Sequence, residues 1–215
     1  GTVVILILIL AAILAPVPAQ NDPYVSLKNS SGTVMTDMSP SESGTILGTD
    51  SLGRDEFSRL VYAARVSMSV GLVAVGISTV VGVVLGAVSG YFGGVADMII
   101  KRCVDVINCF PVMFLIIIIA AILNPSIYNV MIVIGLCNWT GTARLVRGEI
   151  LRVREMEYVQ AAVSLGATDF RIIFSHIIPN VMAPIIVEAT MQMARAILTE
   201  ASLSYLGCGV QLPTA

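Results

Sequence analysis

Residues 157–180 have the sequence EYVQAAVSLGATDFRIIFSHIIPN, a polar, amphipathic stretch between two long apolar runs. An Ala-Ala pair, Ala161 and Ala162, is followed four residues later by Gly166, and Pro179 stands thirteen residues beyond that glycine. Glycine readily takes the left-handed conformation that ends a helix, and proline is tolerated in the first turn of one. The stretch therefore predicts a short helix that ends at Gly166, and a membrane helix that starts at Pro179.

Between these two points, Thr168 or Asp169 can cap a second short helix, with Phe170, Ile173 and Phe174 on its apolar side. A helix presented to a groove is a recurrent recognition mode, so the pair of helices predicts a docking site for a partner. An ordinary solvated hairpin, or a helix lying on the membrane surface, explains the pattern equally well.

The composition defines a membrane protein. Of the 215 residues, 56% are hydrophobic and 12% are charged, whereas soluble domains carry about a quarter charged residues. The four cysteines have no metal-binding or redox spacing, so we predict small apolar packing residues and no metal site. The chain starts at Gly1 inside an apolar run, which predicts a piece of a longer polypeptide.

The fold predicted is an all-α, polytopic helical bundle with five membrane spans. A span needs about 20 apolar residues. The predicted spans cover residues 1–19 (partial), 66–90, 98 or 104 to 123, 127–143 and 177–198. An external loop with an interfacial helix, capped by Asp50 or Ser51, occupies residues 20–65, and an external loop follows at 199–215. Residues 66–198 form the core.

Glycines at positions 82, 86 and 90 recur every fourth residue of the second span. This spacing leaves a smooth groove along one helix face, and it predicts the close approach of another helix.

The distribution of Lys and Arg predicts the orientation, because cytoplasmic loops are enriched in both. The cations after the second and fourth spans are Lys101, Arg102, Arg144, Arg147, Arg152, Arg154 and Arg171, and the short segments after the third and fifth spans hold none. The predicted coupling loop, residues 147–179, is then cytoplasmic. The first loop is external although it carries four cations, which departs from the rule.

Residues 157–180 resemble the EAA loop of permease subunits of bacterial ABC importers. The pattern of that loop is Glu-Ala-Ala, three residues, Gly, nine residues, Ile, one residue, Leu-Pro. Gln160-Ala161-Ala162, Gly166 and Ile178-Pro179 stand in register. Gln160 replaces the usual Glu and His176 the usual Ile, as in the subfamily that imports dipeptides, oligopeptides and nickel. Residues 48–71, 91–105 and 200–213 also resemble the second permease subunit of that subfamily.

The resemblance implies a function in transport, not catalysis. It implies six spans, a homologous second permease, two ATP-binding subunits that supply ATP and Mg, and an extracytoplasmic substrate-binding protein, in the inner membrane of a bacterial cell. No nucleic acid and no cofactor bound by this chain are expected. The residues expected to couple to the ATPases are Glu157, Tyr158, Gln160, Ala161, Ala162, Gly166, Ala167, Asp169, Phe170 and Pro179.

Glu188, Gln192 and Arg195 recur at helical spacing on one face of the fifth span. Ionisable groups at membrane depth face a bundle interior or a water-filled cavity. The stripe therefore predicts part of a translocation path, although a structural Glu188–Arg195 pair bridged by Gln192 remains open. Glu200 lies near the external end, where it contacts either substrate or water.

The function predicted is a permease for di- or oligopeptides, and a nickel or other small-solute importer of the same family is the alternative. The chain has no Walker motif, so ATP chemistry must belong to partner subunits. Two alternatives from other classes are an intramembrane enzyme and a membrane scaffold.

Overall fold

The computed structural model describes residues 21–29, 31–123 and 126–207. The predicted first span, the Asn124-Pro125 turn and most of the last external loop lie outside these residues. Backbone contacts divide the chain into two compact units, with the boundary between Ser69 and Val70. Each unit is treated by itself.

The first unit is mostly loop in its described part, with a four-residue helix, α2 (Pro40–Ser43), and two isolated bridges, Lys28 to Val34 and Thr49 to Asp55. Helix α3 (Glu56–Phe92) begins here. Asp55 is fully buried and caps it, because its carboxylate accepts hydrogen bonds from the Phe57 N–H at 3.1 Å and the Ser58 hydroxyl at 2.7 Å. The predicted cap at Asp50 or Ser51 is therefore wrong, and the predicted interfacial helix stays a prediction.

Asp50 instead organises the loop before the helix. Its carboxylate accepts hydrogen bonds from the N–H groups of Leu52 and Arg54 and pairs with the guanidinium groups of Arg54 and Arg59. Burial alone would raise the pKa of Asp50, but the hydrogen bonds from Arg54 and Leu52 and the charge of Arg54 hold that pKa below its ordinary value.

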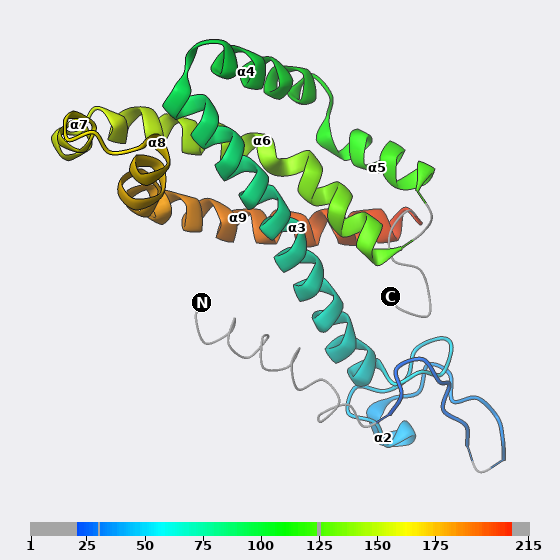
Figure 1. Cartoon of the computed structure of the whole chain (residues 1–215). Helices are drawn as coiled ribbons and strands as arrows, with labels where there is room; N and C mark the ends of the chain where they lie inside the picture. The colour runs from blue at the N-terminus through cyan, green and yellow to red at the C-terminus, as the bar shows by residue number, and fades with distance from the viewer. Residues whose placement is uncertain (1–20, 30, 124–125, 208–215) are drawn as a thin grey trace. The chain divides into compact units, whose positions relative to one another are not determined.

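The second unit is a helical assembly (Figure 1). After α3 come α4 (Gly94–Asn108), α5 (Val112–Ile122), α6 (Ile127–Arg154), α7 (Glu157–Ser164), α8 (Asp169–Arg171), the π-helical stretch η1 (Ile172–Ile177) and α9 (Ile178–Tyr205). Helices α4, α5 and α9 all pack against α6. The predicted all-α class is confirmed for the described residues.

Two described helices are long and apolar enough to cross a membrane, Glu56–Phe92 and Asp169–Tyr205, and a third span exists if α4 and α5 together count as one. The chain is therefore a membrane protein. At about 1.5 Å per residue, 37 residues extend about 55 Å, well beyond a hydrocarbon core of about 30 Å. Only part of each long helix lies in the bilayer.

The third predicted span is not one straight helix. Helices α4 and α5 meet at 84°, with Cys109, Phe110 and Pro111 between them. Proline has no N–H to donate and disfavours helical geometry in the residue before it, so the helix ends before Pro111 and restarts after it.

The fourth predicted span is a helix, α6, but it falls short of the apolar character of the other two. Its polar side chains have partners inside the unit: Asn138 donates to the Ile134 carbonyl, Thr140 donates to Asn108, and Thr142 accepts from Gln192. A helix surrounded by other helices contacts little lipid, which explains how α6 tolerates these groups.

The glycine groove predicted on the second span is confirmed. A Cβ on Gly82 would lie 2.5 Å from the Thr142 Cβ, and one on Gly86 would lie 2.7 Å from the Ala143 carbonyl oxygen. A Cβ on Gly90 would lie 3.0 Å from the Ile150 Cβ. Helix α6 therefore packs directly on the backbone of α3.

The fifth predicted span differs at both ends. The helix runs without a break from Asp169 to Tyr205, so it does not start at Pro179, and residues 199–205 are helix instead of loop. Pro179 would crowd the backbone carbonyl of Ser175, four residues earlier, in a regular α-helix. Ser175 lies in the wider π-helical turns of η1, so the helix continues past Pro179. At the far end, the Thr199 and Ser202 hydroxyls donate hydrogen bonds to the backbone carbonyls one turn earlier, those of Arg195 and Leu198. These bonds satisfy the polar side chains within the helix.

Candidate coupling segment and membrane cavity

The docking segment, residues 157–174, consists of α7, a turn, α8 and the start of η1. Helix α7 ends in a Schellman motif: the Ala167 N–H donates to the Ala162 carbonyl at 3.1 Å and the Gly166 N–H donates to the Val163 carbonyl at 2.9 Å. Gly166 has φ +77°, so its predicted role as the helix-ending residue is confirmed. The turn is thereby fixed by backbone geometry.

Buried side chains attach the docking segment to the bundle. Val159 and Ile172 belong to one hydrophobic cluster with residues of α3, α6 and α9, and Ala167 packs against it. Val159 is fully buried, as is Val146 of α6. The cluster makes the segment and the membrane helices one packed body.

The outer surface of the segment is apolar and uncovered. Leu165 is 88% exposed and Phe170 is 71% exposed, and the Phe170 and Phe174 rings stack with centroids 4.3 Å apart. Tyr158 and Val163 are also exposed. Exposed apolar clusters of this kind mark contact surfaces for another protein or for the membrane.

Polar contacts join the segment to two other helices. The Tyr91 hydroxyl of α3 donates to Asp169 at 2.7 Å, and the Tyr91 carbonyl accepts from Arg154 of α6 at 3.1 Å. Gln160 donates to the Arg154 carbonyl at 3.1 Å. The Asp169 carboxylate is therefore hydrogen-bonded to Tyr91. Thr168 occupies the N-cap position of α8, but its side chain makes no capping hydrogen bond.

A second ionic centre lies at Asp97 of α4. Its carboxylate pairs with Arg147 of α6 at 2.5 and 2.9 Å and with Lys101 at 2.7 Å, and it accepts a hydrogen bond from Ser89 of α3. The centre joins α3, α4 and α6 around one carboxylate. The sequence gave no reason to pair Asp97 with Arg147, fifty residues away.

The other predicted coupling residues lie on the surface of the segment. Glu157 stands exposed in the first turn of α7, Ala161 is exposed and Ala162 is half-buried. Pro179 is exposed beyond the segment. Their predicted contact with ATPases stays a prediction.

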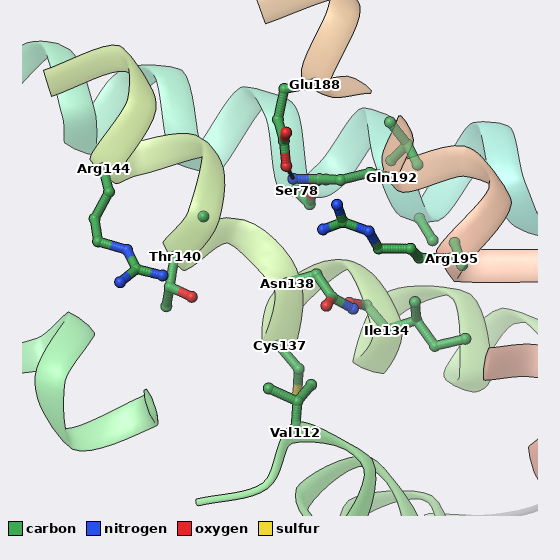
Figure 2. A pocket seen from close by; sticks show the side chains of 14 residues that line it. Ser78, Val112, Ile134, Cys137, Asn138, Thr140, Arg144, Glu188, Gln192 and Arg195 are labelled. Carbon is green, nitrogen blue, oxygen red and sulfur yellow. Dashed lines mark hydrogen bonds between the residues drawn. The ribbon is translucent and has the colours of Figure 1, made fainter. Parts of the chain in front are cut away.

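The predicted membrane stripe borders a cavity of about 170 Å³ (Figure 2). Glu188, Gln192 and Arg195 all line it, whereas Glu200 does not. Glu200 is instead buried and accepts a hydrogen bond from Ser204. The structure thus brings three of the four predicted path residues together.

Gln192 is the centre of the stripe. Its side-chain oxygen accepts from Ser78 of α3 at 2.5 Å, and its amide donates to Thr142 of α6 at 2.8 Å and to Glu188 at 3.1 Å. Figure 2 shows Ser78, Gln192 and Glu188 converging. Gln192 therefore binds three helices together and orients the Glu188 carboxylate.

The cavity also contains groups that the sequence did not single out, Arg144 and Asn138 of α6 and Ser78 of α3. They are separated from the stripe by more than forty residues in sequence, so no local spacing relates them to it. Helix packing alone brings them there.

The sequence profile of the family described as "binding-protein-dependent transport system inner membrane component" matches residues 82–215. The chain belongs to this family. It is 46% identical over 166 residues to the dipeptide transport system permease DppC of Alkalihalophilus pseudofirmus, an alignment that covers 77% of the chain and 55% of that relative.

Two further relatives align over the whole chain. The oligopeptide transport system permease OppC of Bacillus subtilis is 37% identical, with 68% of that relative covered. The dipeptide transport system permease DppC of Haemophilus influenzae is 37% identical, with 72% covered. The chain thus spans about half to three quarters of the length of these relatives, all of which are named as permeases.

Proposed function

We propose that this chain is a permease subunit of an ATP-driven importer of di- or oligopeptides in a bacterial inner membrane. It forms the translocation path with a homologous second permease and receives substrate from an external binding protein. Two partner subunits bind ATP and Mg, and this chain binds no cofactor. The docking segment faces the cytoplasm and carries the motion of those subunits to the membrane helices.

The docking segment is the observation that supports this proposal most. Its outer side exposes Leu165 and Phe170, and its inner side places Val159 in the cluster shared by α3, α6 and α9. A rigid body with an uncovered apolar face can transmit a push, because packed cores shift as units and do not deform continuously.

The membrane cavity supports the choice of peptides over nickel. Two arginines and a single carboxylate line it, and like charge repels a bare divalent cation. Among the described residues, no group of three or more His, Cys, Asp or Glu is arranged to hold a metal ion. The relatives named above are dipeptide and oligopeptide permeases.

Co-purification separates this proposal from an intramembrane enzyme and from a scaffold. Affinity purification of the tagged full-length protein should recover two ATP-binding subunits and a second permease. The purified complex in proteoliposomes should take up a radiolabelled dipeptide only with both ATP and the binding protein present. Uptake that is independent of ATP, or isolation of the chain alone, contradicts the proposal.

A further inference from the structure

The membrane cavity combines charges that have no oppositely charged partner among the residues that the structure describes. Glu188 accepts a hydrogen bond only from the neutral Gln192 amide, and it pairs with no cation among the described residues. The guanidinium groups of Arg144 and Arg195 pair with no acidic side chain in the same part of the chain. Glu188 and Arg195 therefore form no ion pair in the described part of the chain, although the sequence allowed one.

Charges left unpaired at membrane depth are costly unless water or a ligand satisfies them. A ligand with one cationic and one anionic end satisfies Glu188 and Arg195 at once. We propose that this cavity binds both termini of a short linear peptide, with the α-ammonium on Glu188 and the α-carboxylate on Arg195. The inference rests on the proposed import function and names the chemistry by which the permease itself recognises its cargo.

Helical geometry gives the spacing of the two sites. Glu188 and Arg195 lie seven residues apart on α9, a rise of about 10.5 Å on one helix face. An extended dipeptide spans at most about 7 Å and a tripeptide about 11 Å. Two flexible side chains span the remaining difference, so the pair matches the ends of a peptide of two or three residues.

The remaining lining fits a peptide backbone. Asn138 brings a side-chain amide that both donates and accepts, as a peptide bond requires, and Figure 2 shows it beside Arg195. The cavity of about 170 Å³ is smaller than a typical site for a drug-sized ligand, about 300–1,000 Å³. It therefore suits a ligand of two or three residues.

Arg144 lies on the opposite wall, on α6. It also lines a second cavity of about 270 Å³ together with Asp105, Lys101 and Arg147. We assign the carboxylate to Arg195 because Arg195 shares the helix face of Glu188. Arg144 keeps the cavity cationic and serves as an internal alternative in the test.

Binding of radiolabelled Ala-Ala to the complete purified transporter, without the binding protein, tests the assignment. Competition by unlabelled Ala-Ala, N-acetyl-Ala-Ala and Ala-Ala amide gives the preference for each free terminus. Because one charged hydrogen bond is worth about tenfold or more, wild type should bind each blocked peptide at least about tenfold more weakly than Ala-Ala.

Glu188→Gln should remove the preference for the free amino terminus and leave the preference for the free carboxylate unchanged. Arg195→Gln should do the reverse. Glu42→Gln and Arg65→Gln, the same chemical changes in the first unit, should keep both preferences. This split separates recognition from a structural effect, which would weaken all three peptides equally.

The assignment is overturned if Ala-Ala does not bind wild type, if both variants lose both preferences equally, or if Arg144→Gln and not Arg195→Gln removes the carboxylate preference. Uptake of Ala-Ala with ATP and the binding protein is measured in parallel. Absence of uptake by wild type contradicts the proposed function, whereas normal uptake with unchanged preferences in the variants contradicts only the terminus assignment.

Discussion

Replacing Gly166 with valine is expected to uncouple ATP hydrolysis from uptake. Gly166 has φ +77°, and a side chain added there would meet nothing within 4 Å. The substitution therefore introduces backbone strain and no clash. The left-handed conformation costs an ordinary L-residue about 1–2 kcal/mol, and a β-branched residue more.

A cost of 1–2 kcal/mol lowers the population of the bent docking segment by about 5- to 30-fold. Gly166→Asn should stay near wild type because asparagine tolerates the left-handed region, Gly166→Ala should be intermediate, and Gly166→Val should lose most uptake. Gly148→Val is the matched control, because Gly148 is helical and a side chain there also meets nothing within 4 Å.

The assay is ATP-dependent dipeptide uptake by membrane vesicles, with the inserted amount of each variant determined by immunoblot. The order Asn, Ala, Val follows from backbone strain alone. Normal uptake by Gly166→Val, or an equal loss in Gly148→Val, would refute the reasoning.

Three further outcomes follow from the contacts described above. Gly86→Ala should destabilise the purified protein by about 1–3 kcal/mol in thermal denaturation, whereas Gly76→Ala, which meets nothing within 4 Å, should not. Tyr91→Phe should reduce coupled uptake by removing a hydrogen bond worth about 1 kcal/mol, and it should have no added effect in an Asp169→Ala background, where no acceptor is left. The pKa of Asp50 in the folded protein is below the ordinary value of 3.8, so the ionised Asp50 stabilises the first unit above pH 3.8 and this stabilisation is lost as the pH falls below that value. Proteolysis of the first unit should therefore become faster below pH 3.8 in the wild type. The Asp50→Asn variant should show a weaker dependence on pH.

Local backbone features were predictable from the sequence. The four-residue spacing of Gly82, Gly86 and Gly90 indicated close helix packing, and α6 does lie against these residues. Gly166 was identified as a helix end because its constraint acts within a few residues of the chain.

Features that depend on packing were not predictable. Apolar content alone placed the third span across Pro111, and only the backbone shows the 84° bend there. The lower apolar content of α6 is tolerated because α4, α5 and α9 pack against it, and the hydropathy of a single segment cannot reveal this packing. Asp55, and not Asp50, caps α3 because the bridge between Thr49 and Asp55 places it at the helix start.

The sequence predicted which residues of α9 share a face, but not the residues of other helices that contact them. Helical spacing placed Glu188, Gln192 and Arg195 on one face, and the cavity contains all three. Glu200 does not line the cavity and accepts a hydrogen bond from Ser204, so its predicted place on the path stays a prediction. Arg144 and Tyr91 act across helices that are distant in sequence, so no motif indicated them.

Crosslinking from Phe170 tests the coupling role of the docking segment most directly. Phe170 and Phe114 are similarly exposed, at 71% and 65%, but Phe114 lies on α5, outside the segment. A photoreactive phenylalanine analogue at Phe170 should crosslink to an ATP-binding subunit with a yield that changes on ATP addition, and the analogue at Phe114 should not. Absence of an ATPase adduct at Phe170, or equal yields at both positions, would contradict the account.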